Sequence, residues 1–267
     1  MFVSCFYITT SEIELVKKGL IESIVMKICV INPNSTKSMT ASICNTAKKI
    51  ASETTEIICF TPDNGPESIE GYYDGVFGAL GTLEGIQKYP DADGYIIACF
   101  DDTGLDAARS YTKQPIVGIG EAGFHAACLI AENFTVITTL PRSVNIIRNN
   151  LEKYGLIKRC TNVRASNIAV LDLENLPNAN EETISNQVKK AIEEDHGQAI
   201  VLGCAGMSDF ASELSKKHSI PIIDGVSSAV FLVEGLIRSG LKSSNLGGYE
   251  QPRKKKYKGQ LQQFEPK

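Results

Sequence analysis

Short runs of β-branched and aliphatic residues alternate along the chain with longer stretches whose apolar side chains recur about every 3.6 residues. The short runs predict strands at 27–31, 55–60, 94–100, 115–119, 134–139, 167–172, 198–203 and 221–224. Strands that alternate with amphipathic helices are typical of βαβ units, which build parallel sheets. The pattern therefore predicts an α/β protein.

Helices are expected between these strands. One is predicted over 37–52, where Met39, Ile43, Ala47 and Ile50 share one face. Another is predicted over 141–154, because it opens with a proline and is followed by Gly155. The last, over 226–239, is expected to return to the first half of the chain and complete it.

The two halves of the chain resemble each other. Segments 92–120 and 196–226 share a strand, a cysteine, a short loop, a helix and a Pro-Ile strand. This repeat predicts two pseudo-symmetric Rossmann-like domains, each with a four-stranded, mostly parallel sheet, and an active site in the cleft between them. The expected division is an N-terminal extension (1–26), a first domain (27–117 plus 226–246), a second domain (118–225) and a basic tail (247–267).

Both ends of the chain lie outside this pattern. Residues 1–26 lack the basic start of a secretory signal. They fit either a short amphipathic helix, with apolar residues at 13, 16, 20 and 24, or a translation start upstream of Met26, and we favour the second interpretation. The tail carries Arg253, Lys254, Lys255, Lys256 and Lys258 without apolar periodicity, which predicts a solvated segment packed by at most a few aromatic side chains.

Composition narrows the function classes. The chain has 267 residues, 43% hydrophobic and 22% charged, and a net charge of −4. This balance offers no field that would gather a nucleic acid or a membrane surface, and the apolar runs fall far short of the roughly 20 residues that cross a bilayer. The eight cysteines form no C-x-x-C pair, which favours reduced thiols and a cytoplasmic protein. The three histidines have no ligand spacing, so no metal is expected.

Two cysteines occupy equivalent places in the repeat. Cys99 and Cys204 each stand at the carboxyl end of a predicted strand, just before a helix. Ligands bind beyond the carboxyl ends of parallel strands, and a helix N-terminus lowers the pKa of a nearby thiol. We therefore expect these two thiols to be candidate acid/base groups. The other apolar-run cysteines are interpreted as buried structural thiols: Cys29, Cys44, Cys59, Cys128 and Cys160.

Polar residues at other strand ends are candidates for the same cleft. Asn34 and Ser35 follow the first strand and precede a helix, so they are expected either to hold a substrate oxygen or to form an N-capping turn. Thr138 and Thr139 end the fifth predicted strand and are expected to face the cleft from the second domain.

A glycine motif offers an alternative. Gly118, Gly120 and Gly123 form G-x-G-x-x-G between a strand and a helix, as in dinucleotide-binding proteins. The next strand, however, ends in threonines where an acidic ribose contact is required. We therefore interpret these glycines as the crossover between domains and expect no cofactor. Glu121 and His125 on the following helix form either a simple helical pair or a support for Cys99.

The motifs INPNST, PESIEGYYDG, ADGYIIACFDDTGLDAAR, VGIGEAGFHAA, TTLPRS and IVLGCAGMSDF resemble the Asp/Glu/hydantoin racemase superfamily, specifically its hydantoin and allantoin racemase branch. The resemblance runs from about Lys27 to Lys242. It implies a cofactor-independent proton transfer at C5 of a hydantoin ring, with Cys99 and Cys204 as facing acid and base, in a homo-oligomer. In the family, the residue two positions after the first cysteine is often Gly or Ser, followed by Asp-Pro. This chain has Asp101 at that position, followed by Asp102. The added negative charge raises thiol pKa values and leaves the preferred substrate open.

The chemistry agrees with this resemblance. Racemisation needs one deprotonated and one protonated group on opposite faces of a carbon, and a thiol pair supplies both while carrying a single charge. Loop amides are expected to stabilise the developing enolate oxygen; the candidates lie around Asn34, Phe100, Asp101, Gly203 and Ala205. The alternatives are another superfamily activity (amino-acid racemase, decarboxylase or cis-trans isomerase) or a non-catalytic small-molecule sensor.

Overall fold

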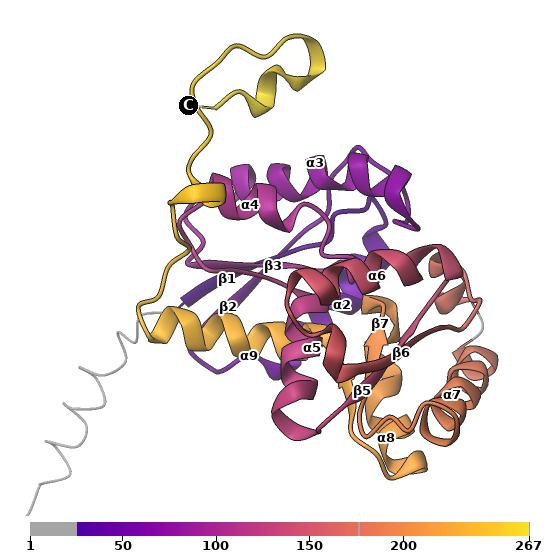
Figure 1. Cartoon of the computed structure of the whole chain (residues 1–267). Helices are drawn as coiled ribbons and strands as arrows, with labels where there is room; N and C mark the ends of the chain where they lie inside the picture. Colours follow the sequence, from indigo (N-terminus) through magenta and orange to yellow (C-terminus); the bar gives the residue numbers. More distant parts are fainter. Residues whose placement is uncertain (1–25, 176, 267) are drawn as a thin grey trace, which may run out of the picture.

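The computed structural model describes residues 26–175 and 177–266 and contains two four-stranded sheets (Figure 1). In the first, the order is β2-β1-β3-β4, formed by β1 (Met26–Ile31), β2 (Thr55–Phe60), β3 (Gly94–Ile97) and β4 (Ile116–Gly118). In the second, the order is β6-β5-β7-β8, formed by β5 (Phe134–Thr138), β6 (Cys160–Ala165), β7 (Ile200–Gly203) and β8 (Ile222–Asp224). Every strand pair is parallel. The α/β prediction of two matching parallel sheets is therefore confirmed.

Helices cover both faces of each sheet (Figure 1). The outer face of the first sheet carries α3 (Tyr72–Lys88) and α4 (Leu105–Tyr111), and its inner face carries α2 (Lys37–Ile50) and α9 (Gly225–Arg238). The inner face of the second sheet carries α5 (Ile119–Ile130) and α6 (Pro141–Lys153), and its outer face carries α7 (Pro177–Glu193) and α8 (Ala211–His218). The three helices predicted from the sequence end within two residues of their expected bounds.

One hydrophobic core joins the two sheets. Alternate strand residues face opposite ways, and the inward residues Val30, Ile96, Val136 and Val201 belong to one cluster that includes α5 and α9. The outward residues form two separate clusters, one under α3 and α4 and one under α7 and α8. Because α9 packs against strands of both sheets, the two halves are not independent, and the division into domains stays a proposal.

The sixth strand lies elsewhere than predicted. The apolar segment 167–172 was expected to be a strand, but it forms a loop that leads into the 3-10 helix η2 (Val170–Glu174), and the strand is Cys160–Ala165. That strand reads CTNVRA and lies at the edge of the second sheet. An edge strand is only partly buried and needs no continuous apolar run, which is why the hydrophobic pattern missed it.

The all-thiol interpretation is wrong for one pair of cysteines. Cys44 on α2 and Cys59 on β2 form a disulfide bond, with their Cα atoms 6.0 Å apart. The sequence pattern missed the pair because fifteen residues separate the two positions and only the packing of α2 on β2 brings them together. Five other cysteines of the described residues are free: Cys29, Cys99, Cys128, Cys160 and Cys204.

The structure describes the C-terminal tail up to residue 266 but not residues 1–25. The proposed extension lies outside the described residues, except for Met26, which begins β1. The basic tail contains two short 3-10 helices, Gly247–Tyr249 and Gly259–Phe264. Two aromatic side chains attach it to the body: Phe264 is buried, and the Tyr249 hydroxyl donates to Asp106. No helix within 26–175 and 177–266 is both long and apolar enough to cross a bilayer.

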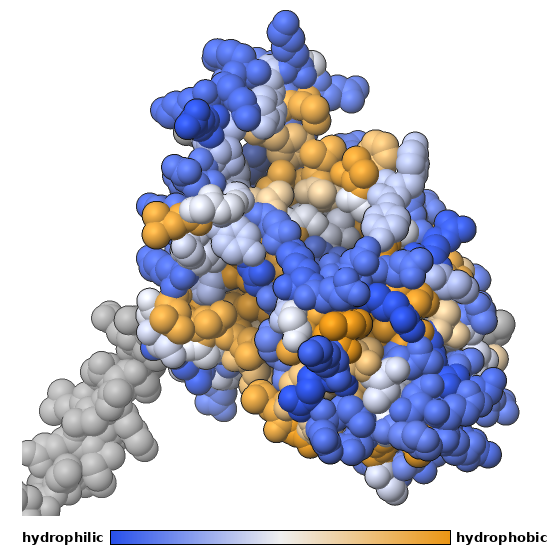
Figure 2. Space-filling view, in the orientation of Figure 1, coloured by the Kyte–Doolittle hydropathy of each residue, from blue (hydrophilic) through white to orange (hydrophobic). Residues whose placement is uncertain are grey.

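On the face that Figure 2 shows, polar side chains predominate, and apolar side chains gather in separate patches, one of them over α9. The inward face of α9 buries Val226, Val230 and Val233, whereas Phe231 on its other side is 61% exposed. Helix α9 is therefore apolar on more than the face that it turns to the core.

The glycine motif has a packing role in this fold. The Asp102 carboxylate, in the loop after β3, accepts hydrogen bonds from the backbone N–H groups of Gly120 and Glu121 at the start of α5. A Cβ atom at Gly118 would lie 1.9 Å from Asp102 Oδ1, and one at Gly120 would lie 2.4 Å from a backbone oxygen. These two glycines thus make room for a buried carboxylate at a helix N-terminus, which agrees with the crossover interpretation.

We predict that Gly118→Ala destabilises the protein by about 1–3 kcal/mol, because the added methyl group overlaps a carboxylate that is held by three donors. Gly235→Ala in α9 is the matched control, since a Cβ there meets nothing within 4 Å. Alanine in a helix interior is more favourable than glycine, so the control is neutral or stabilising by up to about 1 kcal/mol. Urea unfolding of both variants measures the difference. Equal stabilities would contradict the packing role of Gly118.

Candidate active site

The strand order brings four loops together. In each sheet the first strand of the half lies next to the third, β1 beside β3 and β5 beside β7. Between these two strands the strand order reverses direction, and ligands bind outside the carboxyl ends of strands at such a point. The loops after these four strands line one cavity between the sheets, together with residues of α2, α6, η2 and the 66–71 loop. Its lining is Asn34, Met39, Ile69, Ala98, Cys99, Phe100, Asp101, Thr138, Thr139, Ser143, Val170, Gly203, Cys204 and Ala205.

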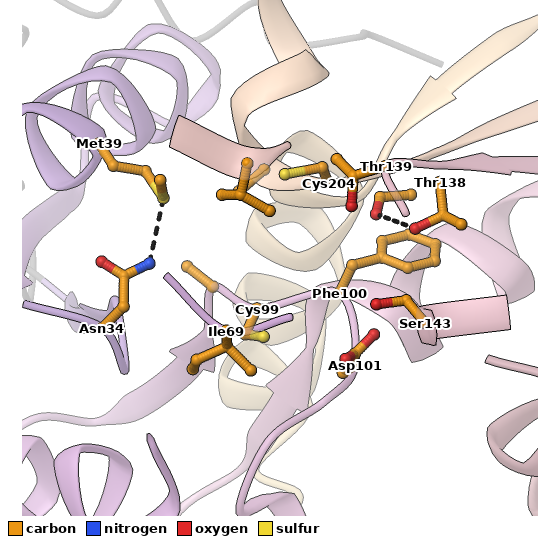
Figure 3. Close-up of a pocket in the computed structure, with 14 residues that line it drawn as sticks. Asn34, Met39, Ile69, Cys99, Phe100, Asp101, Thr138, Thr139, Ser143 and Cys204 are labelled. Atoms are coloured by element: carbon orange, nitrogen blue, oxygen red, sulfur yellow. Dashed lines mark hydrogen bonds between the residues drawn. The ribbon is translucent and has the colours of Figure 1, made fainter. Parts of the chain in front are cut away.

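The cavity is small and enclosed. The volume open to water in it is about 30 Å³, which is room for about two water molecules. Cys99 and Cys204 are half-buried by residue and lie at opposite sides of the cavity (Figure 3). A substrate ring larger than two waters requires the walls to part before it reaches both sulfur atoms.

The two cysteines share a local geometry. Asp102 N–H donates to the Cys99 carbonyl oxygen, and Met207 N–H donates to the Cys204 carbonyl oxygen, each at 3.0 Å. In both turns the backbone N–H two residues after the cysteine is directed at the sulfur, from Asp101 to Cys99 and from Gly206 to Cys204. The pseudo-symmetry seen in the sequence therefore extends to the environment of each thiol.

The helix positions differ between the two halves. Cys204 directly precedes the 3-10 helix η3 (Ala205–Phe210). The helix after Cys99, in contrast, begins only at Leu105, so no helix N-terminus adjoins that thiol. A hydroxyl takes this place, since Thr103 Oγ1 lies 3.3 Å from Cys99 Sγ.

The expected lowering of the thiol pKa values is wrong. Burial is the largest influence, and it raises the pKa of Cys204 to about 12 and the pKa of Cys99 well above its ordinary value. The negative charge of Asp101 raises both pKa values further. The backbone N–H groups and the Thr103 hydroxyl lower them, but not enough to offset the lost solvation.

Asp101 is the acidic side chain of this cavity. Its carboxyl faces the Ser143 hydroxyl of α6 (Figure 3), and its Oδ2 atom is buried without a hydrogen-bond partner. Burial raises the pKa of Asp101 to about 7, while the Ser143 hydroxyl lowers it. Among the described residues that line the cavity, none is Lys, Arg or His, so this carboxyl has no cation beside it there.

The loop after β1 is held by its own amides. Asn34 Oδ1 accepts from Asn32 Nδ2 and from the Thr36 N–H, which leaves Asn34 Nδ2 directed at Met39 Sδ (Figure 3). The Asn34 backbone N–H donates to Asn32 Oδ1, so it is not free for an enolate as expected. Ser35 is not part of the lining, because its hydroxyl donates to the Gly65 carbonyl oxygen.

The remaining residues named from the sequence all line the cavity: Phe100, Thr138, Thr139, Gly203 and Ala205. Thr138 Oγ1 donates to the Gly203 carbonyl oxygen and so joins β5 to β7 at this end of the second sheet. The Phe100 ring packs edge-on against Phe124 of the core. These contacts fix the floor of the cavity.

Sequence reasoning missed five lining residues: Met39, Ile69, Ala98, Ser143 and Val170. Ile69 and Ser143 lie in PESIEGYYDG and TTLPRS, motifs that carried the family resemblance, so the signal was present. No signal pointed to Val170, because the sequence predicts its segment, 167–172, to be a strand.

Glu121 and His125 lie away from both thiols. They line a separate groove between α5 and α9, where Glu121 forms an ion pair with Arg109. Glu121 bears on the Cys99 loop through its backbone N–H, which donates to Asp102, and through its negative charge, which raises the pKa of Asp102. Within the described residues, no group of three or more His, Cys, Asp or Glu side chains is arranged to hold a metal ion.

Comparisons with known proteins agree on one family. The family model described as Asp/Glu/Hydantoin racemase matches residues 28–233. The chain is 43% identical to a hydantoin racemase from a Pseudomonas species, over 90% of this chain and 97% of that protein. Its fold matches a solved allantoin racemase from Klebsiella pneumoniae with a TM-score of 0.88 and 40% identity, over 90% of this chain and 99% of the other. The allantoin racemase from Pseudomonas fluorescens gives 0.85 and 37%, over 88% and 100%.

The raised thiol pKa values predict how Cys99 and Cys204 react with iodoacetamide when no substrate is added. Only thiolate reacts, so each alkylation rate rises about tenfold per pH unit through pH 10, without a plateau. Mass spectrometry of the cysteine peptides follows each site. The slope of the alkylation rate against pH reports ionisation of the thiol even if the narrow cavity slows the entry of iodoacetamide. A plateau below pH 9 at either site would contradict the raised pKa values.

Proposed function

The chain belongs to the Asp/Glu/hydantoin racemase family, and from this membership we propose that it interconverts the enantiomers of a hydantoin-type substrate, a 5-substituted hydantoin or allantoin. The proposed reaction uses no cofactor and transfers a proton at C5 between Cys99 and Cys204. The observation that carries the proposal is the pair of thiols at equivalent strand ends, on opposite sides of one enclosed cavity.

The proposed reaction has two proton transfers. One cysteine, as thiolate, removes the C5 proton from one face of the ring, and the electron pair moves to the C4 carbonyl oxygen to form an enolate. The other cysteine, as thiol, then delivers its proton to the opposite face and becomes the thiolate. Atoms and charge balance, and the two cysteines have exchanged roles. The same pair therefore serves the reverse direction.

The charge of the cavity favours a neutral ring over an amino acid. An amino-acid racemase or a decarboxylase of this family binds a substrate carboxylate, which requires a cationic or strongly donating site. No Lys, Arg or His appears among the described lining residues, and Asp101 adds an acidic group. A hydantoin is uncharged and presents N–H and C=O groups, which suit Asn34, Thr139 and Ser143.

A non-catalytic sensor requires no pair of equivalent thiols. It would leave the optical activity of a pure enantiomer unchanged, whereas a racemase abolishes it. A cytoplasmic location and a homo-oligomeric state stay predictions, as does the division into domains 27–117 plus 226–246 and 118–225.

We predict that the protein racemises D- and L-5-substituted hydantoins or (R)- and (S)-allantoin, followed by circular dichroism. Cys99→Ser and Cys204→Ser each lower the rate by at least about a hundredfold, because a serine hydroxyl without a base partner is a poor proton acceptor. Cys128→Ser is the control, since this free cysteine lies outside the cavity. Near-wild-type racemisation by either serine variant would remove that cysteine from the mechanism.

Proton exchange in deuterated water distinguishes the two thiols. Each single variant retains exchange of the C5 proton for one enantiomer over the other, with opposite preferences in the two variants. The double variant loses both, and it racemises little more slowly than either single variant because the pair acts as a unit. Equal exchange of both enantiomers by one variant would mean that a single base reaches both faces.

The two-thiol chemistry also predicts independence from metals and nucleotides. Prolonged dialysis against a chelator, followed by desalting, leaves the racemisation rate unchanged. If activity disappears and returns with zinc, manganese or a nicotinamide nucleotide, the proposed mechanism is wrong.

A further inference from the structure

The Asp101 carboxyl is a third ionisable group in the cavity, and the two proton transfers above do not use it. Its Oδ2 atom is buried and has no partner. Both thiols are influenced by its charge, since Asp101 raises the pKa of Cys99 and of Cys204. These three groups therefore cannot ionise independently.

The charged groups around Asp101 do not neutralise it. Asp102, the next residue, turns its carboxyl to Gly120, Glu121 and Tyr154 and is not part of the lining. Burial raises its pKa to about 7 as well, so it titrates in the same range as Asp101, and the Asp101 variants separate the two carboxyls. Glu70 accepts from the Val170 N–H and adds negative charge near Cys204.

The nearby cations are engaged elsewhere. Arg142 of α6 packs against Gly71, and Lys153 pairs with Asp106; neither lines the cavity. Two negative charges in this enclosed space would consequently repel each other with little screening.

Asp101 is also the first of the three groups to lose its proton. Its pKa lies near 7, whereas both thiols have strongly raised pKa values. At neutral to mildly alkaline pH the cavity therefore holds one negative charge, on Asp101, and two neutral thiols. The proposed racemisation, however, starts from a thiolate.

We propose that Asp101 accepts the proton that one of the two thiols gives up when substrate enters, so that the carboxyl and the thiols share a single negative charge. This inference rests on the proposed function. The S–H bond breaks, an O–H bond forms on the carboxyl, and the net charge of the site does not change. The new O–H then donates a hydrogen bond to a carbonyl oxygen of the ring, where negative charge develops in the enolate.

The shared charge predicts an unusual pH dependence. The competent state, thiolate with protonated Asp101, has the same number of protons as the resting state, thiol with ionised Asp101. Racemisation therefore rises with pH as the first proton leaves this set of groups, near the pKa of Asp101 and not near that of a thiol.

Asp101→Asn tests this directly, because it keeps the size and a hydrogen-bond donor but removes the proton acceptor. In this variant kcat/KM keeps rising with pH beyond the point near the pKa of Asp101 at which the wild type levels off, because no carboxyl is left to take the negative charge from the thiols; at pH 7 the rate changes by less than about threefold. Asp106→Asn is the control, since this exposed carboxylate pairs with Lys153 in the same part of the chain, and its profile stays as in the wild type. A loss that is uniform across pH, or a shift to lower pH, would overturn the proposal.

Alkylation without substrate provides the second measurement. Removing the Asp101 charge lets the thiols ionise more easily, so in Asp101→Asn the iodoacetamide profile moves to lower pH by about one unit. In both assays the variant departs from the wild type only above the pKa of Asp101, a pH-dependent difference that a merely structural role does not produce. If the wild type racemises no hydantoin, the proposed function fails, while an alkylation profile unchanged by Asp101→Asn overturns the shared charge by itself.

Ser143→Ala covers the case in which Asp101→Asn does not fold, as judged by thermal melting. It removes the hydroxyl that lowers the pKa of Asp101, so the pH at which kcat/KM levels off moves upward by less than in Asp101→Asn. An unchanged profile in this variant would count against Asp101 as the acceptor.

Discussion

The buried carboxylate of Asp102 holds the first cysteine loop in place. It accepts from the N–H groups of Gly120 and Glu121 and from the Tyr154 hydroxyl, so it ties the loop after β3 to the start of α5 and to the end of α6. Asp102 itself adopts a positive φ of 52°, a conformation that aspartate tolerates better than most residues. Because α5 and α6 cover the second sheet, this one side chain sets where Cys99 lies relative to Cys204.

The site then balances burial against a few fixed donors. The cavity leaves both thiols little contact with water, and the resulting loss of solvation outweighs one N–H group per sulfur and the Thr103 hydroxyl. An enclosed site of this kind stores no thiolate in the resting protein. It instead limits the total negative charge, and the ligand that enters must be compatible with Asp101 and with the absence of a cation among the described lining residues. A neutral ring meets both conditions.

The shared inner core explains how two halves keep two thiols in register. Val30 and Ile96 of the first sheet belong to the same cluster as Val136 and Val201 of the second. The interior is packed tightly enough that a shift of one sheet disturbs the other. Entry of a substrate into so small a cavity therefore involves the loop that carries Ile69, which lies outside this cluster, more readily than the sheets.

The sequence by itself determined the strand and helix periods, the repeat of the two halves and the equivalent places of Cys99 and Cys204, since local hydrophobic spacing and internal similarity are written in one dimension. Most of the predicted lining followed from the rule that parallel strands present ligands at their carboxyl ends. Tertiary structure decided what depends on neighbours distant in the chain. The edge position of Cys160–Ala165 removed its apolar signal, the packing of α2 on β2 paired Cys44 with Cys59, and enclosure by both sheets raised the thiol pKa values that the sequence predicted to be lowered. Burial and desolvation are properties of the assembled surroundings, so no local pattern contains them.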